Sequence, residues 1–161
     1  MSLKKPALDP MSLAPRTSSG YPEPYRSRVT PREKRALGDA LGLETIGINL
    51  TTLPPGKESS MRHWHTHEEE FIYVLSGEVV LVTDAGEQLL TAGMCAGFPA
   101  APEGSPGDAH QLINRGNQPA TYLEVSNRDP RDQGHYPDVD LHFHGAAASV
   151  RFTRKDGSQF P

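Results

Sequence analysis

The sequence predicts an all-β protein, a sandwich or barrel of short strands, and three observations lead to this class. Strand-like runs separated by turn residues recur about every 8–12 residues, which is the spacing of such folds. The 161 residues include 15 Gly and 15 Pro, which disfavour long helices. There is no βαβ unit of about 30 residues and no phosphate-binding loop, so nucleotide-binding folds are excluded. The length and the 35% hydrophobic content fit one domain with a modest core.

The first 29 residues predict an extended N-terminal arm. They are rich in Pro, Ser and Arg and show no hydrophobic period. Two interpretations remain open: the arm is disordered, or Tyr21, Tyr25 and Val29 anchor it on the surface of the barrel.

A short helix is predicted after the arm. Thr30 at the N-cap, Pro31 at the first helical position and Glu33 at the third have the pattern of a capping box. The helix is expected to reach Leu37 and to end at Gly38. Residues 1–43 are therefore assigned to the arm and this helix.

The chain has a β pattern from Glu44 onward. Ile46, Ile48 and Leu50 alternate with Thr, Gly and Asn, as in a half-buried strand. Further strand-like runs follow at residues 59–66, 69–75, 78–83, 87–91, 94–98, 109–114 and 120–126. Residues 44–126 are predicted to form the barrel. Residues 127–161, which are polar again, are predicted to be a C-terminal extension that packs on it.

Charge and composition exclude several classes of partner. Sixteen Lys and Arg against 20 Asp and Glu give a net charge of −4, so no nucleic acid or anionic membrane partner is expected. No apolar run approaches the 18 or more residues of a membrane span, and no secretory signal is visible. The single cysteine, Cys95, excludes an internal disulfide and is expected to be buried. These observations predict a cytoplasmic protein.

Three histidines within five residues form a candidate metal-binding segment. His63, His65 and His67 alternate, so in a strand they share one face. Two such imidazoles can reach one ion, and Glu70, which returns on the next strand, can supply a carboxylate. This donor set suits Zn, Mn, Fe, Co or Ni. His67 is expected at the strand end or in the turn, at the mouth of the site.

This segment resembles the first motif of the cupin superfamily. The pattern His63-x-His65, four residues, Glu70, six residues and Gly77 fits that motif. The second motif is matched by Gly93, Pro99, His110 and Asn114, although Ala101 stands where the motif has Gly. The link from Pro99 to His110 is also longer than the motif's, and this insert is expected at the barrel mouth. The chain also resembles, over nearly its whole length, a group of uncharacterised single-domain bacterial cupins that includes proteins named as sugar-phosphate isomerase-like. This resemblance rests on His63-Trp-His65 followed by Glu68-Glu-Glu-Phe71, on Tyr136-Pro-Asp-Val-Asp-Leu141 and on Arg151-Phe-Thr-Arg-Lys-Asp-Gly157.

The resemblance implies a fold, a ligand set and an assembly. The fold is a double-stranded β-helix, the jelly-roll barrel of cupins. One divalent transition metal (Zn, Mn, Fe or Ni) is held by four ligands, namely His63, His65, Glu70 and His110. One or two positions stay open for water or substrate, as in catalytic metal sites. A homodimer is also implied, since single-domain cupins commonly pair through sheet edges and N-terminal arms.

Three side chains are candidates for acid–base chemistry beside such a metal. They are His67, Tyr122 and Glu124. Tyr122 and Glu124 alternate with Leu123 and Val125 along one strand, so they face either the barrel interior or solvent. Both orientations remain open on the sequence alone.

Three functions fit these residues. The first is a metal-dependent isomerase or epimerase of a small polar metabolite, which includes sugars and sugar phosphates. The second is a non-haem Fe(II) dioxygenase, for which an apolar barrel lined by Ile72, Val74 and Leu112 is suitable. The third is a non-catalytic module that binds or senses a small molecule. The identity of the metal would discriminate between them.

Overall fold

Strands with alternating burial build almost all of the regular structure in the computed structural model, which describes residues 3–102, 104–145 and 150–161. Residues 1–2 of the predicted arm, residue 103 of the insert and residues 146–149 of the extension lie outside the described residues. The elements in chain order are η1 (Pro10–Ser12), α1 (Tyr25–Val29), β1 (Glu33–Ala36), α2 (Leu37–Leu41), β2 (Ile46–Leu53), β3 (Trp64–His65), β4 (Glu70–Ser76), β5 (Glu78–Thr83), β6 (Gly86–Thr91), β7 (Cys95–Phe98), β8 (Gln111–Ile113), β9 (Ala120–Asn127), β10 (Gln133–His135), β11 (His142–His144) and β12 (Arg151–Thr153).

One wall of the molecule is a five-stranded antiparallel sheet in the order β1-β2-β9-β4-β7. The strands β2 and β9 pair along eight residues, from Ile46 opposite Asn127 to Leu53 opposite Ala120. On β4, Glu70 lies opposite Ser126 of β9 and Ile72 lies opposite Glu124. Because directly opposed residues project from the same face of a sheet, this register places Glu124 on the same face as Glu70.

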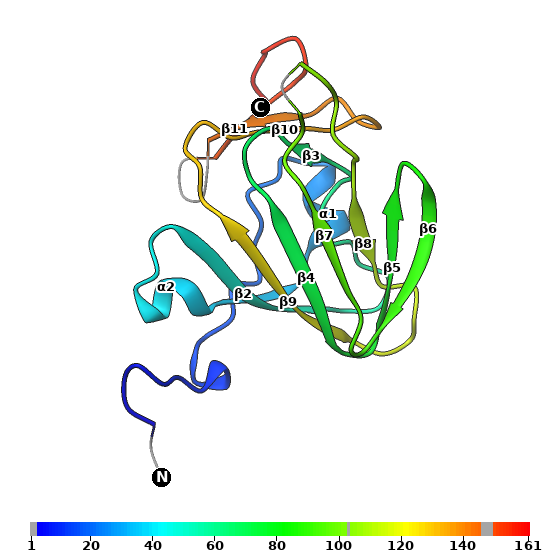
Figure 1. Cartoon of the computed structure of the whole chain (residues 1–161). Helices are drawn as coiled ribbons and strands as arrows, with labels where there is room; N and C mark the ends of the chain where they lie inside the picture. The colour runs from blue at the N-terminus through cyan, green and yellow to red at the C-terminus, as the bar shows by residue number, and fades with distance from the viewer. Residues whose placement is uncertain (1–2, 103, 146–149) are drawn as a thin grey trace.

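The opposite wall consists of two smaller sheets, β6-β5-β8 and β12-β11-β10-β3. Isolated bridges link them, because His63 pairs with His110 and Glu58 pairs with Ile113. The two walls enclose a jelly-roll barrel, with β10 and β11 across one end (Figure 1). The predicted all-β jelly-roll class is thereby confirmed, and the short helices α1 and α2 lie at other positions than the predicted one.

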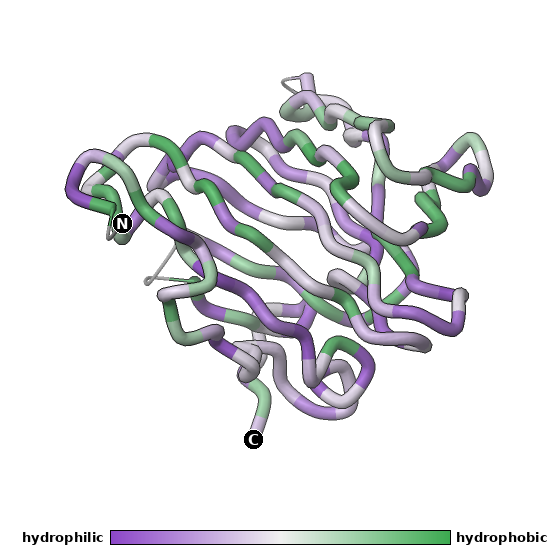
Figure 2. The backbone as a smooth tube through the Cα atoms, turned by 90° about the horizontal axis from the view of Figure 1, so that it is seen from below, coloured by the Kyte–Doolittle hydropathy of each residue, from purple (hydrophilic) through white to green (hydrophobic). Residues whose placement is uncertain are grey.

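Two hydrophobic clusters form the core of the molecule. Hydrophobic and hydrophilic stretches alternate along the strands (Figure 2). The first cluster lies between the five-stranded and three-stranded sheets and consists of Leu53, Ile72, Val74, Val79, Leu81, Leu90, Leu112, Ala120 and Tyr122. The second joins the arm to the C-terminal extension and consists of Tyr21, Val29, Met61, Tyr136, Leu141 and Phe143. The buried histidines of the candidate site contact residues of this second cluster.

The helix predicted from Thr30 to Leu37 is wrong. Thr30 instead follows α1 as its C-cap, and its hydroxyl donates to the carbonyl of Arg26. Glu33–Ala36 form β1, which pairs with β2 and is bridged on its other side by Arg16. The local capping pattern is overridden because this segment supplies an edge strand to the five-stranded sheet. The strand predicted over residues 59–66 is also shorter, since only Trp64–His65 form β3.

The arm is anchored rather than free at its C-terminal part. Tyr21 and Val29 are buried, which matches the second of the two interpretations of the arm. Cys95, expected to be buried, is exposed instead. It lies opposite Tyr73 on the outer face of the five-stranded sheet, and alternation from Cys95 turns Ala96 inward.

No helix in the described part of the chain has the length and apolar character needed to cross a membrane. The predicted cytoplasmic location and the division at residues 43 and 126 stay predictions.

Candidate metal centre

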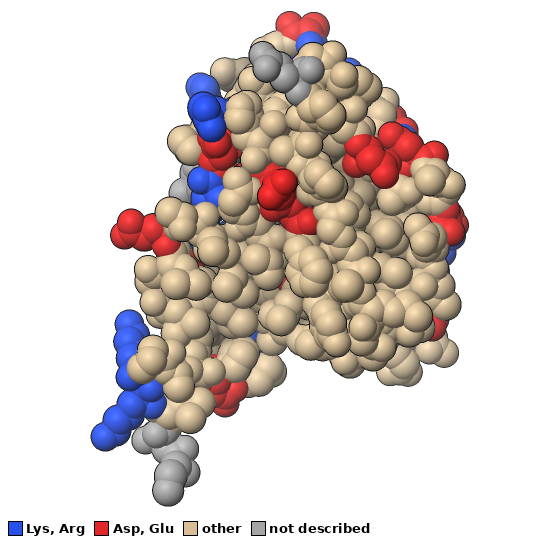
Figure 3. All heavy atoms as spheres, in the orientation of Figure 1, with Lys and Arg blue, Asp and Glu red and all other residues tan. Residues whose placement is uncertain are grey.

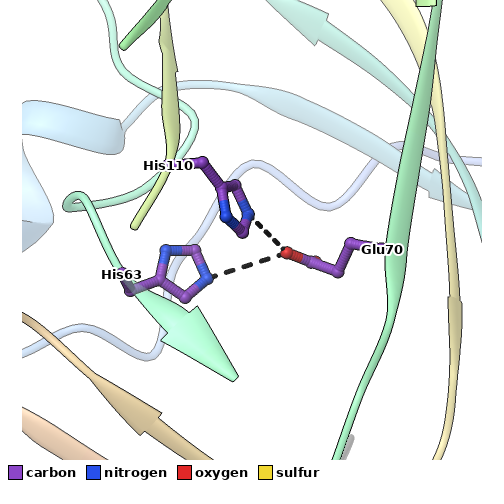
Figure 4. A group of neighbouring side chains, drawn as sticks. All are labelled: His63, Glu70 and His110. Atoms are coloured by element: carbon purple, nitrogen blue, oxygen red, sulfur yellow. Dashed lines mark hydrogen bonds and ion pairs between the residues drawn. The ribbon is translucent and has the colours of Figure 1, made fainter. Parts of the chain in front are cut away.

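Three histidines and one glutamate reach the same point inside the barrel from opposite walls. His63 and His65 lie on the same face because they are two residues apart in an extended segment. The backbones of His63 and His110 exchange two hydrogen bonds, N–H to carbonyl, of 3.1 and 2.9 Å. This bridge places the two imidazoles side by side. Glu70 begins β4 on the facing wall and points toward them (Figure 4).

The donor atoms converge on one carboxylate oxygen. Glu70 Oε2 lies 3.9 Å from His63 Nε2 and 3.3 Å from His65 Nε2. It lies 2.8 Å from His110 Nε2. Ligand atoms about 2.0–2.1 Å from a tetrahedral ion are roughly 3.3 Å apart, so this spacing fits a metal ion at the centre. His65 Nε2 is buried without a hydrogen-bond partner among the described residues, as expected for a metal ligand.

The other ring nitrogen of two histidines is already bonded. His63 Nδ1–H donates to the carbonyl of Met61 at 2.9 Å, and His65 Nδ1–H donates to Asp132 Oδ2 at 2.7 Å. A proton held on Nδ1 leaves the Nε2 lone pair free for a metal. The ring of His110 stacks on Phe98 with centroids 3.7 Å apart. All three rings are thus oriented by contacts outside the donor set.

Asp132 is a site residue that the sequence analysis did not identify. Its carboxylate is fully buried, and Oδ1 accepts the backbone N–H groups of His67 at 2.8 Å and Glu68 at 3.1 Å. It also accepts the hydroxyl of Thr66 at 3.3 Å. A carboxylate behind a metal-binding histidine fixes the ring and increases its basicity. Asp132 lies in the polar extension, where no periodicity marks it.

Charge is distributed unevenly over these groups. Burial lowers the pKa of His63 to about 3, which keeps this imidazole neutral. Burial acts in the same direction on His65, but the charge of Glu70 and the hydrogen bond to Asp132 outweigh it and raise the pKa of His65 to about 10. Burial opposes the ionisation of Glu70, yet the charge of His65 and the hydrogen bond from His110 hold the pKa of Glu70 well below its usual range. A metal ion would replace the proton of His65.

A second group of potential donors, His65, Glu68 and Asp132, lies beside the first. The carboxylate of Asp132 is already occupied by two backbone N–H groups and by His65. Burial raises the pKa of Glu68 to about 7, so this carboxyl group is partly protonated near neutral pH, whereas Glu70 is ionised. The group of His63, Glu70 and His110, to which His65 adds its Nε2, is therefore the better metal centre.

Two tyrosines that the sequence analysis did not assign to the site form its wall on the side of the arm. The ring of Tyr136 stacks on His63 with centroids 5.4 Å apart. Its hydroxyl lies 3.1 Å from that of Tyr21, and both residues are buried. Burial raises the pKa of both phenols, so both stay protonated. The arm therefore contributes to the surroundings of the candidate metal centre.

The predicted acid–base residues occupy two different places. Tyr122 and Glu124 lie on the inner face of β9, and the hydroxyl of Tyr122 is buried without a partner among the described residues. Glu124 is paired with Lys34 of β1 and accepts a hydrogen bond from Asn49 at 3.2 Å. His67 lies in the turn after β3, where its Nδ1 is 2.7 Å from the hydroxyl of Thr66. The roles assigned to these residues stay predictions.

Two hollows lie around the site. A groove of about 500 Å³ has Glu70 on its wall and is otherwise lined by Ile46, Glu69, Phe71, Gly97, Phe98, Pro99, Val125, Ser126 and Asn127. Because Phe71 and its strand partners Gly97 and Val125 project from the outer face of the five-stranded sheet, this groove extends over the outside of the barrel. A second hollow of about 820 Å³ lies between the insert and β3, with Trp64, Thr66 and His67 on its wall. The insert is held there by a hydrogen bond from the N–H of Ala101 to the carbonyl of His65, at 2.8 Å. The groove beside Glu70 has no Lys or Arg among its described lining residues.

The fold and the donor set define a jelly-roll protein with a candidate metal centre inside its barrel. The sequence model of the cupin domain matches residues 49–126, which contain all four candidate ligands. The chain belongs to the cupin superfamily, since a solved cupin structure matches it over nearly its whole length.

Solved structures extend the likeness. A protein from Silicibacter pomeroyi described as a sugar phosphate isomerase from a cupin superfamily is 42% identical, with 97% of each chain covered and a TM-score of 0.88. A candidate sugar phosphate isomerase from Acidithiobacillus ferrooxidans is 30% identical, with 82% of this chain and 83% of that chain covered and a TM-score of 0.69. The polyketide cyclase RemF from Streptomyces resistomycificus shares the fold alone, at 19% identity, with 77% and 80% covered and a TM-score of 0.62. None of the curated proteins matches the chain.

Proposed function

We propose that this cupin is a metal-dependent enzyme of the isomerase or epimerase type that acts on a small polar metabolite with a carbonyl group. One observation carries the proposal: three imidazole Nε2 atoms and one carboxylate oxygen converge within 2.8–3.9 Å inside the barrel. Four protein ligands leave one or two positions for a substrate on a divalent transition metal. The two solved relatives above that are described as sugar phosphate isomerases support the same reaction class.

A divalent metal at this site would supply polarisation of the substrate carbonyl, which acidifies the neighbouring C–H bond. The protein's part is to hold the substrate and to move that proton. Glu124 is the proposed base, since its carboxylate faces inward and is oriented by Lys34 and Asn49. Tyr122 is the proposed acid, because its hydroxyl is buried on the same inner face as Glu124 and has no hydrogen-bond partner among the described residues. His67, in the turn after β3, is a further candidate for acid–base chemistry.

The charges near the site are compatible with a free sugar and with a sugar phosphate. Arg62 pairs with Asp84 and Asp138, and Arg115 pairs with Glu87, so these two cations are engaged elsewhere. Arg32 lies closer, because its positive charge opposes the rise in the pKa of the buried Tyr21, Tyr122 and Tyr136. A guanidinium is a suitable partner for a phosphate.

Metal analysis and proton exchange together test this proposal. Elemental mass spectrometry of untagged protein, purified without chelator or nickel resin, is expected to find about one Zn, Mn or Ni per chain. The metal-loaded protein should then exchange the α-proton of an accepted hydroxy-carbonyl compound with deuterium from solvent, as followed by proton NMR. Glu124→Gln should abolish this exchange and leave the metal content unchanged. Glu87→Gln, which changes an exposed carboxylate on β6, is the matched control.

Other metal contents would favour the other functions. About one iron per chain, with oxygen uptake on addition of substrate, would support the dioxygenase, for which the buried Ile72, Val74 and Leu112 provide an apolar interior. No metal after purification and none after reconstitution would refute the enzyme proposal. A module that binds or senses a small molecule would then be the better interpretation.

We also propose that the protein forms a homodimer through the outer face of the five-stranded sheet. Phe71, Tyr73 and Leu75 project from β4 on this face and are 41%, 39% and 45% exposed. Figure 3 shows that the side on which β4, β7 and β9 lie is largely free of charged residues below a central acidic group. Tyr21 and Val29 of the N-terminal arm are buried in their own chain. Sedimentation of Tyr73→Glu should show a shift to monomer, with Thr83→Glu on β5 as the control.

A further inference from the structure

A second group of imidazoles lies outside the barrel, on the four-stranded sheet. His135 of β10 pairs directly with His142 of β11, and His144 follows two residues later on the same face. Alternation turns Phe143, between the two histidines, to the opposite face, where its ring contacts His65. The three imidazoles therefore point away from the candidate metal centre.

The spacing of this outer trio resembles that of the barrel histidines. The ring centroids of His135 and His142 are 4.4 Å apart, and those of His142 and His144 are 4.3 Å apart. In the barrel, the ring of His63 lies 4.8 Å from that of His65 and 4.9 Å from that of His110. Two imidazoles bound to one tetrahedral ion have centroids about 5 Å apart. The three outer rings are not among the described groups whose donor atoms already lie within 4.8 Å of one another, so their side chains must rotate to bring the nitrogens to a common ion.

Neighbouring side chains orient two of the three outer imidazoles, those of His135 and His142. The indole of Trp64 stacks on His135 with centroids 4.1 Å apart and fixes that ring. Gln133 Oε1 accepts a hydrogen bond from His142 Nε2 at 3.2 Å, which leaves the Nδ1 lone pair of His142 free. Burial and the two neighbouring imidazoles lower the pKa of His142 to about 4, so it is neutral at physiological pH.

We propose that His135, His142 and His144 bind a second divalent transition metal ion. Nitrogen-only donors select Cu²⁺, Ni²⁺ or Zn²⁺ over Mg²⁺ or Ca²⁺. The three rings line a hollow of about 610 Å³ together with Trp64, Thr153 and Asp156, so water can complete the coordination. Arg154 and Lys155 line the same hollow, and their positive charges weaken the binding of a cation there. Without a carboxylate in the donor set, this site binds more weakly than the barrel site. It is independent of the proposed catalytic function.

Zinc titration of the untagged, full-length, metal-free protein by isothermal calorimetry tests the proposal. The wild type is expected to bind two zinc ions per chain in two resolved events. His142→Gln/His144→Gln should keep the tighter event and lose the weaker one. His110→Gln is the reciprocal variant, and it should weaken the tighter event and keep the other. Circular dichroism of each variant verifies that the fold is retained.

Two outcomes would overturn the proposal. One is a single zinc event in the wild type that His142→Gln/His144→Gln leaves unchanged. The other is a second event that persists in the double variant, because the ion would then bind elsewhere. If the barrel site binds no zinc, the wild type shows a single event and His142→Gln/His144→Gln removes it. That result would contradict the barrel site and not the outer one. Electron paramagnetic resonance of the wild type loaded with two Cu²⁺ ions should show a second nitrogen-coordinated signal that is missing in His142→Gln/His144→Gln, and its persistence in that variant would also contradict the proposal.

Discussion

Replacement of Asp132 by asparagine should cost both stability and metal affinity. The buried carboxylate accepts His65 Nδ1–H at 2.7 Å and the backbone N–H groups of His67 and Glu68 at 2.8 and 3.1 Å. The asparagine side chain would keep one oxygen for the backbone and would present an amide N–H₂ to the N–H of His65. Two donors would then face each other in a buried position. The imidazole can relieve this only by giving up its Nδ1 proton and keeping a proton on Nε2, the atom that faces Glu70.

The size of the effect follows from these contacts. One hydrogen bond to a charged group, worth about 1.5–3 kcal/mol, is lost, and those to the backbone become weaker. We expect a loss of about 2–4 kcal/mol in the free energy of unfolding, which for a chain of this size lowers Tm by roughly 5–15 °C. Loss of a carboxylate behind a metal-binding histidine typically weakens metal binding about 10–100-fold, and the wrong tautomer places this variant at the upper end.

Calorimetric zinc titration and thermal unfolding of the metal-free protein measure the two effects separately. Asp140→Asn is the matched control, since its side chain is 58% exposed and accepts a hydrogen bond from the backbone N–H of Lys155, away from the barrel histidines. An Asp132→Asn variant that binds zinc as tightly as the wild type would contradict this expectation. A normal affinity would mean that His65 does not need Asp132 to hold its tautomer, or that His65 is not a ligand.

Three further variants test other contacts. Gly134→Ala would place a methyl group 1.8 Å from the ring of Phe143, so we expect a loss of at least about 1–3 kcal/mol in thermal unfolding; an unchanged Tm would contradict the packing. Tyr21→Phe leaves the buried hydroxyl of Tyr136 without its partner and should cost about 1–3 kcal/mol, which a wild-type denaturant midpoint would disprove. The lowered pKa of His142 means that the unfolded chain binds a proton below about pH 6.5 while the folded chain resists until about pH 4. Stability should therefore fall as the pH drops through this window, by about 1 kcal/mol or less after solvent screening, and His142→Gln should reduce that fall.

Much of the barrel is predictable because strand periodicity is a local signal. Residues 78–83 and 120–126 alternate clearly and lie in β5 and β9. The segment Thr30–Glu33 misleads for the same reason, since its capping pattern is also local, whereas its pairing with β2 depends on residues far along the chain. Cys95 shows a further limit: alternation gives two faces but does not say which face is inside, and here Cys95 is outside.

The sequence by itself determined the candidate ligands and the family resemblance, because the spacing of His63, His65 and Glu70 follows from strand geometry and the link between adjacent strands. Only the tertiary structure decided which distant groups complete the site. Asp132 reaches His65 from 67 positions away, and Lys34 reaches Glu124 from another strand. The same is true of His135 and His142, which meet only through the pairing of β10 with β11. Such contacts depend on how the sheets close, and no local pattern of residues encodes that closure.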